Sequence, residues 1–242
     1  MVFIPSIVRL VVVFAVAGLV GQGYLDLLKR SDIGSFAPAS FRARLVLDGP
    51  KGTHEVEIWR SGEAKTLIRF LDPKEREKYL VLLESRLWLL TPGAKKPVRL
   101  RPSHRLYGGA TLDEVLGVRL SQHYDVESVA EKPDTAGSLV VFSLRAKTEE
   151  VLFPAVSYVV RESTERPVSA VFLLRSGRAA TSIEFLDWNE NGPLYARRVL
   201  VQDLLRKGAR TEVRVVELEE LQVPDALFDL ADPTARRALG AS

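Results

Sequence analysis

Histidines and carboxylates are the side chains with which this sequence could bind a metal or transfer a proton. The three histidines, His54, His104 and His123, are not spaced as metal ligands, either with one another or with two carboxylates on one helix face. Asp187 and Glu190 lie close together, but strand positions an odd number of residues apart point to opposite faces, which prevents a general acid–base pair. The sequence therefore predicts no metal site, and we interpret the histidines as polar surface residues.

Nucleophile and nucleotide motifs are the second kind of chemistry to consider. The sequence has no nucleophile elbow and no dinucleotide fingerprint, and Tyr107-Gly108-Gly109 lacks the preceding strand and the following lysine of a phosphate-binding loop. Cysteine is absent, which excludes disulfides, thiolate nucleophiles, cysteine-ligated metals and the lipid-modified cysteine of a bacterial lipoprotein. We therefore expect a protein that is not an enzyme and that uses no cofactor.

Composition places the chain among globular proteins. Of its 242 residues, 46% are hydrophobic and 27% are charged, which is enough apolar material for a substantial core. The 34 lysines and arginines exceed the 31 acids by only three, and the two signs alternate, as over residues 74–78. This balance indicates a mixed, solvated surface and no nucleic-acid partner.

The N-terminus carries an export signal. Leu10–Val20 is an unbroken run of apolar and glycine residues behind Arg9, and small residues follow at Gly21 and Gly23. The run is shorter than the roughly 20 residues that span a bilayer, although apolar residues before Arg9 extend it. We favour a signal peptide over residues 1–23, cleaved after about Gly23 or near Ala17. A retained anchor and a buried N-terminal helix remain the alternatives.

Most of the remaining chain alternates with period two and predicts β-strands. Phe41–Leu47 and His54–Arg60 form a plausible hairpin around a Gly-Pro turn. Further strands are predicted over residues 65–71, 79–83, 87–90, 98–101, 138–146, 158–161, 168–174, 181–186, 195–202 and 211–218. Regular turns and little helix favour a mainly β fold, a single curved antiparallel sheet that forms an open half-barrel with short covering helices.

One internal helix is predicted within a single expected domain. Thr111-Leu112-Asp113-Glu114 is a capping box, and Leu112, Val115 and Leu116 share a face of the short lid that follows. We expect one half-barrel domain over residues 24–230. Within it, Val223–Phe228 is expected to close a sheet edge, and residues 231–242 are expected to form a frayed tail.

Apolar side chains of these strands are the candidate ligand-binding surface. If they line the concave side of one bent sheet, the enclosed volume suits acyl chains. The same residues could instead pack a closed core, and alternation does not separate these two interpretations. The candidate ligand-binding residues are Ile68, Phe70, Val81, Trp88, Leu90, Phe172, Ile183 and Phe185.

Several short segments resemble the LolA-like outer-membrane lipoprotein-sorting proteins, in the superfamily that also contains LolB and RseB. The similarity covers about residues 41–228, and both the order of the segments and the export signal agree with this family. The segments are Leu87-Trp88-Leu89-Leu90-Thr91-Pro92, Val98-Arg99-Leu100, Ser176-Gly177, Thr181–Trp188, Gly192–Arg198 and Val223-Pro224-Asp225 through Phe228. Residues 108–114 depart from the family pattern, because they keep the acids and lack the aromatic residues of that stretch.

The resemblance implies a periplasmic protein whose incomplete β-barrel, covered by helices, holds a lipid or the acyl chains of a lipoprotein. It also makes Arg69 a candidate lid contact, since a cation on the sheet can hydrogen-bond the carbonyl groups of a covering helix. The alternative for Arg69 is an outward-pointing arginine that pairs with an acid on a neighbouring strand.

Two functions follow as hypotheses. The first is a periplasmic carrier that shields acyl chains during lipoprotein sorting and docks on an inner-membrane transporter or an outer-membrane receptor. Lys95-Lys96 and Arg197-Arg198 could serve such docking, or could be ordinary solubilising charges. The second is an envelope sensor or interaction module of the same superfamily, tethered to the inner membrane by an uncleaved leader.

Overall fold

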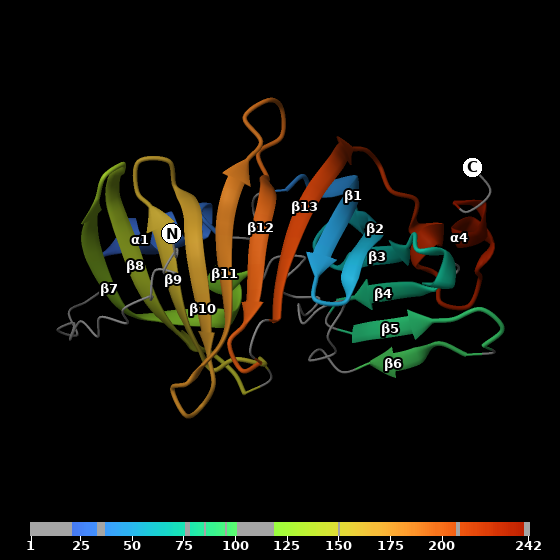
Figure 1. The fold of residues 1–242 in the computed structure, drawn as a ribbon, viewed down its shortest axis with the longest axis horizontal. Coiled ribbons are helices and arrows are strands. Elements are labelled where there is room, and N and C mark those ends of the chain that lie inside the picture. Colours follow the sequence, from blue (N-terminus) through green and yellow to red (C-terminus); the bar gives the residue numbers. More distant parts are fainter. Residues whose placement is uncertain are drawn as a thin grey trace, which may run out of the picture.

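Alternating apolar and polar residues make the strands of this chain pair into one antiparallel sheet, because each strand can then bury one face. The computed structural model describes residues 21–32, 37–75, 78–84, 86–94, 96–100, 119–149, 151–206 and 209–239. In these residues thirteen strands form a single sheet in the order β6-β5-β4-β3-β2-β1-β13-β12-β11-β10-β9-β8-β7 (Figure 1).

The strands occur in two groups along the chain. The first group is β1 (Ser40–Gly49), β2 (Gly52–Ser61), β3 (Lys65–Phe70), β4 (Tyr79–Leu83), β5 (Arg86–Leu90) and β6 (Val98–Leu100). The second group is β7 (Tyr124–Asp134), β8 (Gly137–Ala146), β9 (Ala155–Arg161), β10 (Arg166–Leu173), β11 (Ala179–Trp188), β12 (Ala196–Asp203) and β13 (Ala209–Glu220). Consecutive strands within each group are neighbours, so each group is a meander.

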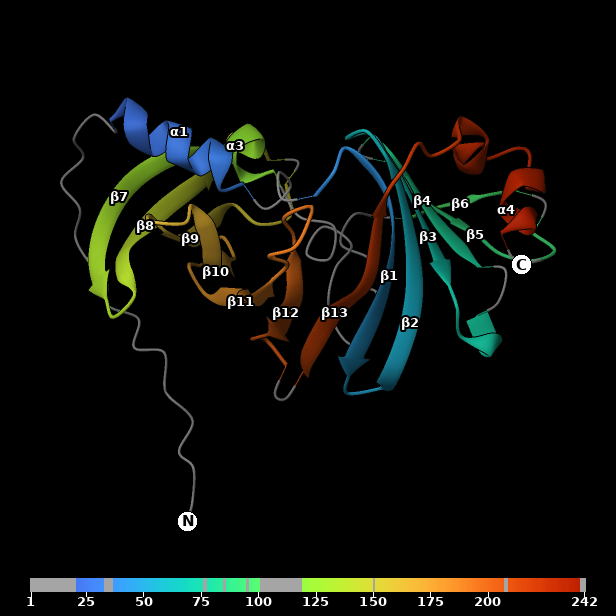
Figure 2. The same cartoon turned by 90° about the horizontal axis from the view of Figure 1, so that it is seen from above.

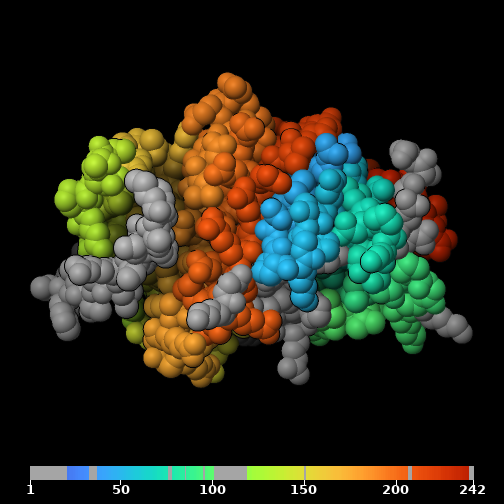
Figure 3. All heavy atoms as spheres, in the orientation of Figure 1, coloured from blue at the N-terminus to red at the C-terminus, as the bar shows by residue number. Residues whose placement is uncertain are grey.

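The two meanders join at the pairing of β1 with β13. These strands lie at opposite ends of the sequence, yet they pair antiparallel, with Leu45 opposite Val215 and Leu47 opposite Val213. The space-filling view shows the orange-red atoms of the last strands directly against the blue atoms of β1 (Figure 3). The described sheet therefore has β6 and β7 at its two edges and is not closed into a barrel, as the sequence predicted.

Irregular pairing accompanies the curvature of this sheet. The register shifts between Arg44 and Leu45 in β1, and between Pro167 and Ser169 in β10. Such bulges bend a strand and increase its twist, and a bulge also accommodates a proline that cannot donate to the ladder. Figure 2 shows the resulting bent sheet from above.

Short helices lie on both sides of the sheet. Helix α1 (Gln22–Arg30) and helix α3 (Leu120–His123) lie on the concave side, across the end formed by β7, β8 and β9 (Figure 2). The 3-10 turn η2 (Pro73–Glu75) follows β3, whereas η4 (Asp225–Phe228) and α4 (Thr234–Ala238) lie on the convex side. No helix of the described residues has the length and apolar character needed to cross a membrane.

Strand β7 and helix α3 were not predicted. β7 continues through Pro133 to Asp134, and the chain reverses at Thr135-Ala136, before Gly137, which begins β8 and has a φ of 116°. β7 is an edge strand with many exposed residues, so its alternation is weak, and an edge tolerates a proline. α3 has four residues, which is too short for a helical periodicity.

The C-terminal segment also differs from its prediction. Val223–Phe228 does not extend the sheet at an edge, and residues 234–238 form α4 where a frayed tail was expected. The segment is ordered because Val223, Leu227 and Phe228 are buried on the convex face. The predicted lid helix and most of the predicted leader lie outside the described residues, and α1 begins at Gln22, inside the predicted leader.

Candidate functional site

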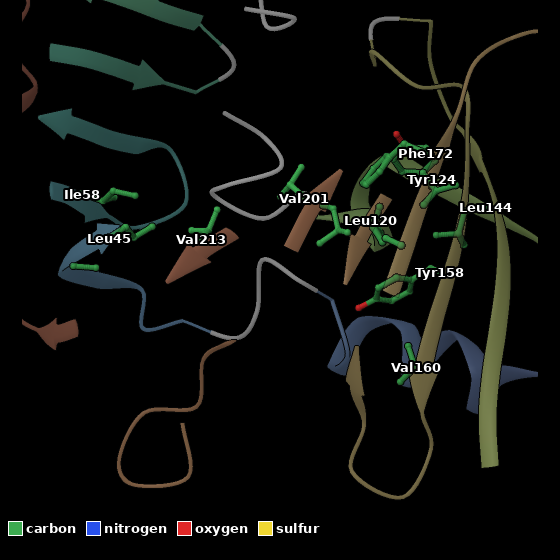
Figure 4. Packing of buried hydrophobic residues seen from close by; sticks show 14 of the residues in the cluster. Leu45, Ile58, Leu120, Tyr124, Leu144, Tyr158, Val160, Phe172, Val201 and Val213 are labelled. Carbon is green, nitrogen blue, oxygen red and sulfur yellow. The ribbon is translucent and has the colours of Figure 1, made fainter. Parts of the chain in front are cut away.

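One apolar cluster covers the concave face of the sheet from one meander to the other. We call it the concave cluster. Its buried members are Leu27 and Leu28 of α1, Leu120 of α3, Phe41, Ala43, Leu45, Leu47, Val56, Ile58, Ile68, Phe70, Leu80 and Leu87 of β1–β5, and Tyr124, Val140, Phe142, Leu144, Val156, Tyr158, Val160, Ala170, Phe172, Ile183, Val201 and Val213 of β7–β13. Figure 4 shows part of it, from Leu45 and Ile58 in the first meander to Leu144 and Tyr158 in the second.

The concave cluster is tightly packed at the end covered by α1 and α3. Phe142 and Tyr158 are fully buried, and their ring centroids are 6.4 Å apart. The ring centroids of Phe153 and Phe172 are 5.2 Å apart. The Tyr158 hydroxyl donates a hydrogen bond to the carbonyl of Ser31, at the end of α1. Burial raises the pKa of Tyr158 well above its usual range, so this hydroxyl stays a donor.

A buried carboxylate holds α3 in place. Asp32 is 1% exposed and accepts hydrogen bonds from the backbone N–H groups of Leu120 and Ser121, each at 2.9 Å. It also accepts a hydrogen bond from the Ser121 hydroxyl at 2.6 Å. Because Asp32 follows α1, these bonds tie the two covering helices together.

Farther from these helices, the same face carries half-buried apolar side chains. The register shows that they share the face, since Leu87 lies opposite Leu82 on one side and Leu100 on the other. The half-buried members on β4, β5, β6, β11, β12 and β13 are Leu82, Leu89, Leu100, Phe185, Val199, Val215 and Leu218. The apolar surface therefore continues beyond the packed end.

The structure places the eight predicted ligand-binding residues on two faces. Five of them, Ile68, Phe70, Phe172, Ile183 and Phe185, belong to or pack against the concave cluster. The other three, Val81, Trp88 and Leu90, lie on the convex face with the C-terminal segment.

The pairing of β3 with β4 explains why these residues separate. Leu80 lies opposite Ile68 on the concave face, so Val81, opposite Leu67, points to the convex side. The expectation that all eight residues share one face is therefore corrected for Val81, Trp88 and Leu90. The tract around Val81 is apolar at every position, so alternation could not tell which side faces inward.

Arg69 also lies on the convex face, where it makes both kinds of contact considered for it. It donates a hydrogen bond to Glu57 on β2 at 3.3 Å, and another to the carbonyl of Leu239 at the end of α4. Glu57 is 4% exposed and also pairs with Arg42 at 2.7 Å. The helix that Arg69 contacts is thus the C-terminal one. The predicted lid residues Leu112, Val115 and Leu116 lie outside the described residues.

Two arginines that the sequence analysis did not single out lie at the edge of the concave cluster. Arg60 continues the row of Val56 and Ile58 on β2, and it is only 9% exposed. Arg119, just before α3, pairs with Glu63 in the turn between β2 and β3, at 2.8 Å. A charged residue at the apolar phase of a strand was the sequence signal for Arg60. Arg119 carries no such signal.

The electrostatics of these arginines are unusual. Burial, together with the positive charge of Arg119, lowers the pKa of Arg60. Arg60 donates from Nε to the Gly62 carbonyl at 3.1 Å. Nε of Arg119 is buried and has no hydrogen-bond partner among the described residues. Two guanidinium groups therefore lie beside one carboxylate, that of Glu63.

Two other residues with possible chemistry, His54 and Glu190, are held in structural contacts. His54 Nδ1 lies 2.5 Å from Asp72 Oδ2, and Glu190 accepts two hydrogen bonds from Arg166, at 2.5 and 3.2 Å. His104 is not among the described residues. Within the described part of the chain, no group of three or more His, Cys, Asp or Glu side chains could hold a metal ion.

Comparison with known proteins identifies related sequences and folds. A family model described only as "Uncharacterized protein" matches residues 62–232, which is more than half of the chain. No curated protein matches the sequence.

Solved structures share the fold at low sequence identity. A LolA superfamily protein from Nitrosomonas europaea superposes with a TM-score of 0.74 at 20% identity, and the match covers 88% of this chain and 98% of that chain. A DUF1329 family protein from Desulfovibrio piger gives 0.73 at 14% identity, over 86% and 96% of the two chains.

A third structure, an outer membrane lipoprotein-sorting protein domain from Vibrio parahaemolyticus, gives a TM-score of 0.69 at 16% identity, over 85% of this chain and 95% of that chain. The resemblance to LolA-like proteins noted in the sequence is thereby confirmed at the level of the fold. The chain belongs to the family of uncharacterized proteins defined by that model, and its fold is that of the LolA superfamily.

Proposed function

We propose that this protein is a non-catalytic periplasmic carrier that shields the acyl chains of a lipid or lipoprotein. The observation that carries the proposal is the concave cluster, which runs across both meanders and keeps half-buried apolar side chains beyond the end covered by α1 and α3. Transfer of an acyl chain from water to such a surface is favourable by about 0.8 kcal/mol per methylene.

Two further observations support the proposal. The sequence begins with the pattern of an export signal, and one protein of the same fold is an outer membrane lipoprotein-sorting domain. A carrier of this kind needs a donor and an acceptor, which in the envelope would be an inner-membrane transporter and an outer-membrane receptor. The residues proposed to contact the acyl chain are the half-buried Phe185, Val199 and Val215. Ile68, Phe70, Phe172 and Ile183 are buried in the same cluster and are proposed to form the apolar layer beneath that surface.

Adjacent valines on β13 provide a matched test. Val215 is half-buried beside the concave cluster, whereas Val216 is 51% exposed outside it. Binding of the neutral fluorescent probe N-phenylnaphthylamine would be titrated in the wild-type protein and in Val215→Asp and Val216→Asp. We expect Val215→Asp to weaken binding by about tenfold, since burying one valine is worth about 1.5 kcal/mol.

The control and the folded state are checked together. Val216→Asp should bind within about twofold of the wild-type protein, and circular dichroism should show both variants folded. If Val215→Asp unfolds, Val215→Thr replaces it with a smaller loss expected. The absence of saturable probe binding, together with no lipid extracted from protein purified from its own envelope fraction, would overturn the carrier function.

A further inference from the structure

Two arginines, Arg60 and Arg119, lie at the edge of the concave cluster near the β2–β3 turn. Arg60 lies on the apolar phase of β2, with Phe41 opposite on β1 and Thr66 opposite on β3. Both neighbours are buried. An amphiphile whose tail lies along this apolar row would therefore place its polar end near the Arg60 guanidinium.

The charge at this edge is not balanced by the described residues. The charged groups that act on Arg60 are Arg119, which is repulsive, and Glu63, which is attractive. Glu63 is already engaged by Nη2 of Arg119, and its side chain is 59% exposed. One solvated carboxylate thus serves two guanidinium groups, which leaves a local excess of positive charge.

Arg119 also has a buried hydrogen-bond donor without an acceptor among the described residues. This donor is its Nε, whereas its Nη2 is paired. A buried N–H group without an acceptor is destabilising, and an anionic oxygen would satisfy it. The planar fork of arginine matches the two oxygens of a carboxylate or phosphate, which makes these two groups the best-fitting ligands.

From these contacts we infer that Arg60 and Arg119 bind the anionic headgroup of the acyl-bearing ligand. This inference rests on the proposed carrier function and adds to it the chemistry of the ligand: a carboxylate or phosphate group attached to an acyl chain. A free anion would fit less well, since Arg60 is in line with the apolar residues Val56 and Ile58, which a hydrocarbon tail complements and a free anion does not.

Glu63 would compete with a bound headgroup for Arg119. Its ion pair with Arg119 links the β2–β3 turn to the residue before α3. A bound headgroup would displace the Glu63 carboxylate, which lies at the surface and is readily hydrated. Removal of this carboxylate should therefore strengthen the binding of an anionic amphiphile.

The test compares two ligands that have the same hydrocarbon chain and differ in the headgroup, an anionic carboxylate or a neutral hydroxyl. Oleic acid and oleyl alcohol would each displace N-phenylnaphthylamine from the full chain at mildly alkaline pH, where the acid is ionised. The wild-type protein should prefer the acid by about tenfold. Arg119→Gln should abolish this preference and leave the affinity for the alcohol within about twofold, and Glu63→Gln should increase the affinity for the acid.

Arg161→Gln is the matched control. Arg161 is 24% exposed and pairs with Asp134 at 2.8 Å, whereas Arg119 is 26% exposed and pairs with Glu63 at the same distance. Arg161 follows Val160 of the concave cluster on β9, so it lies on the other face. This variant should keep the preference of the wild-type protein for the acid. Arg119→Gln carries the test because Arg60→Gln alters a residue inside the fold.

The possible results separate the headgroup site from the carrier function. Equal displacement by acid and alcohol in the wild-type protein would overturn the headgroup site and leave the carrier function standing. Displacement by neither lipid would overturn the carrier function itself. Inorganic phosphate that binds alone, dependent on Arg119 and as tightly as the acid, would identify a free-anion site and overturn the headgroup assignment.

Discussion

The carboxylate of Asp32 connects the two helices, α1 and α3, that cover the concave face of the sheet. Asp32 is buried, and it receives three hydrogen bonds from Leu120 and Ser121. Since α3 has only four residues, it would not be a stable helix by itself. The hydrogen bonds to Asp32 stabilise it. The carboxylate thus converts a short turn into part of a rigid cover.

Replacing Asp32 tests this role. Asp32→Asn keeps the shape and one acceptor oxygen, but its amide N–H₂ group would face one of the two backbone N–H groups, which would then have no acceptor. We expect a loss of about 2 kcal/mol in the free energy of unfolding, measured by urea titration of the full chain. Asp26→Asn on the exposed side of α1 should change it by less than about 0.5 kcal/mol. Equal losses in the two variants would contradict the role of Asp32.

The face on which a side chain lies was predictable where polar residues mark the phase of a strand. Arg69 separates Ile68 from Phe70, and both of these belong to the concave cluster. Trp88 lies in an entirely apolar tract, where alternation is silent, and it belongs to the other face. The pairing of Arg119 with Glu63 joins positions far apart in sequence, which no local pattern can indicate.

At the scale of elements, the C-terminal segment acts as a second layer on the convex face. Leu227 and Phe228 pack against the cluster of Leu67, Tyr79 and Val81. Polar contacts reinforce this layer. They are the hydrogen bond from the Tyr79 hydroxyl to the carbonyl of Arg236, at 3.2 Å, and the ion pair of Lys65 with Asp225, at 2.8 Å.

Truncation of the buried aromatic side chain measures how much this layer contributes. Phe228 is 4% exposed, so Phe228→Ala leaves a cavity over β3 and β4. We expect a loss of about 3 kcal/mol in the free energy of unfolding. Leu186→Ala, at a residue that is 41% exposed, should cost much less and serves as the control. A frayed, dispensable tail would instead give similar small losses in both variants.

Individual strands were predictable to within a few residues because turns and alternation are local properties. The hairpin of β1 and β2 and the strands β4 and β5 match their predicted ranges closely. The order of the strands was not predictable in this way. The pairing of β1 with β13 depends on packing across the whole domain, and nothing near either strand specifies it.

At the scale of the whole molecule, the open sheet should be least stable at its edges. β1 and β13 each pair with a neighbour on both sides, whereas among the described strands β6 and β7 each pair on one side only. β6 has three residues, and its Val98 is 51% exposed. Amide exchange depends on local opening, which is easiest where few contacts must break.

Hydrogen exchange followed by mass spectrometry would test this gradient. Peptides from β1 and β13 should exchange slowest and those from β6 fastest, with the outward-facing amides of β7 also rapid. Addition of an acyl ligand should slow exchange in β11–β13 more than in α4, because only the former contribute half-buried residues to the concave cluster. Uniform exchange along the sheet would contradict the assigned edges.

The pairing of β1 with β13 has a consequence for incompletely synthesised chains. β1 is synthesised well before its partner β13, which is complete only at Glu220. A prematurely terminated product that lacks β13 would expose unpaired backbone on both β1 and β12, in the middle of the sheet. Such a fragment has two additional unpaired strand edges, so it should associate with other chains and be degraded more readily by proteases.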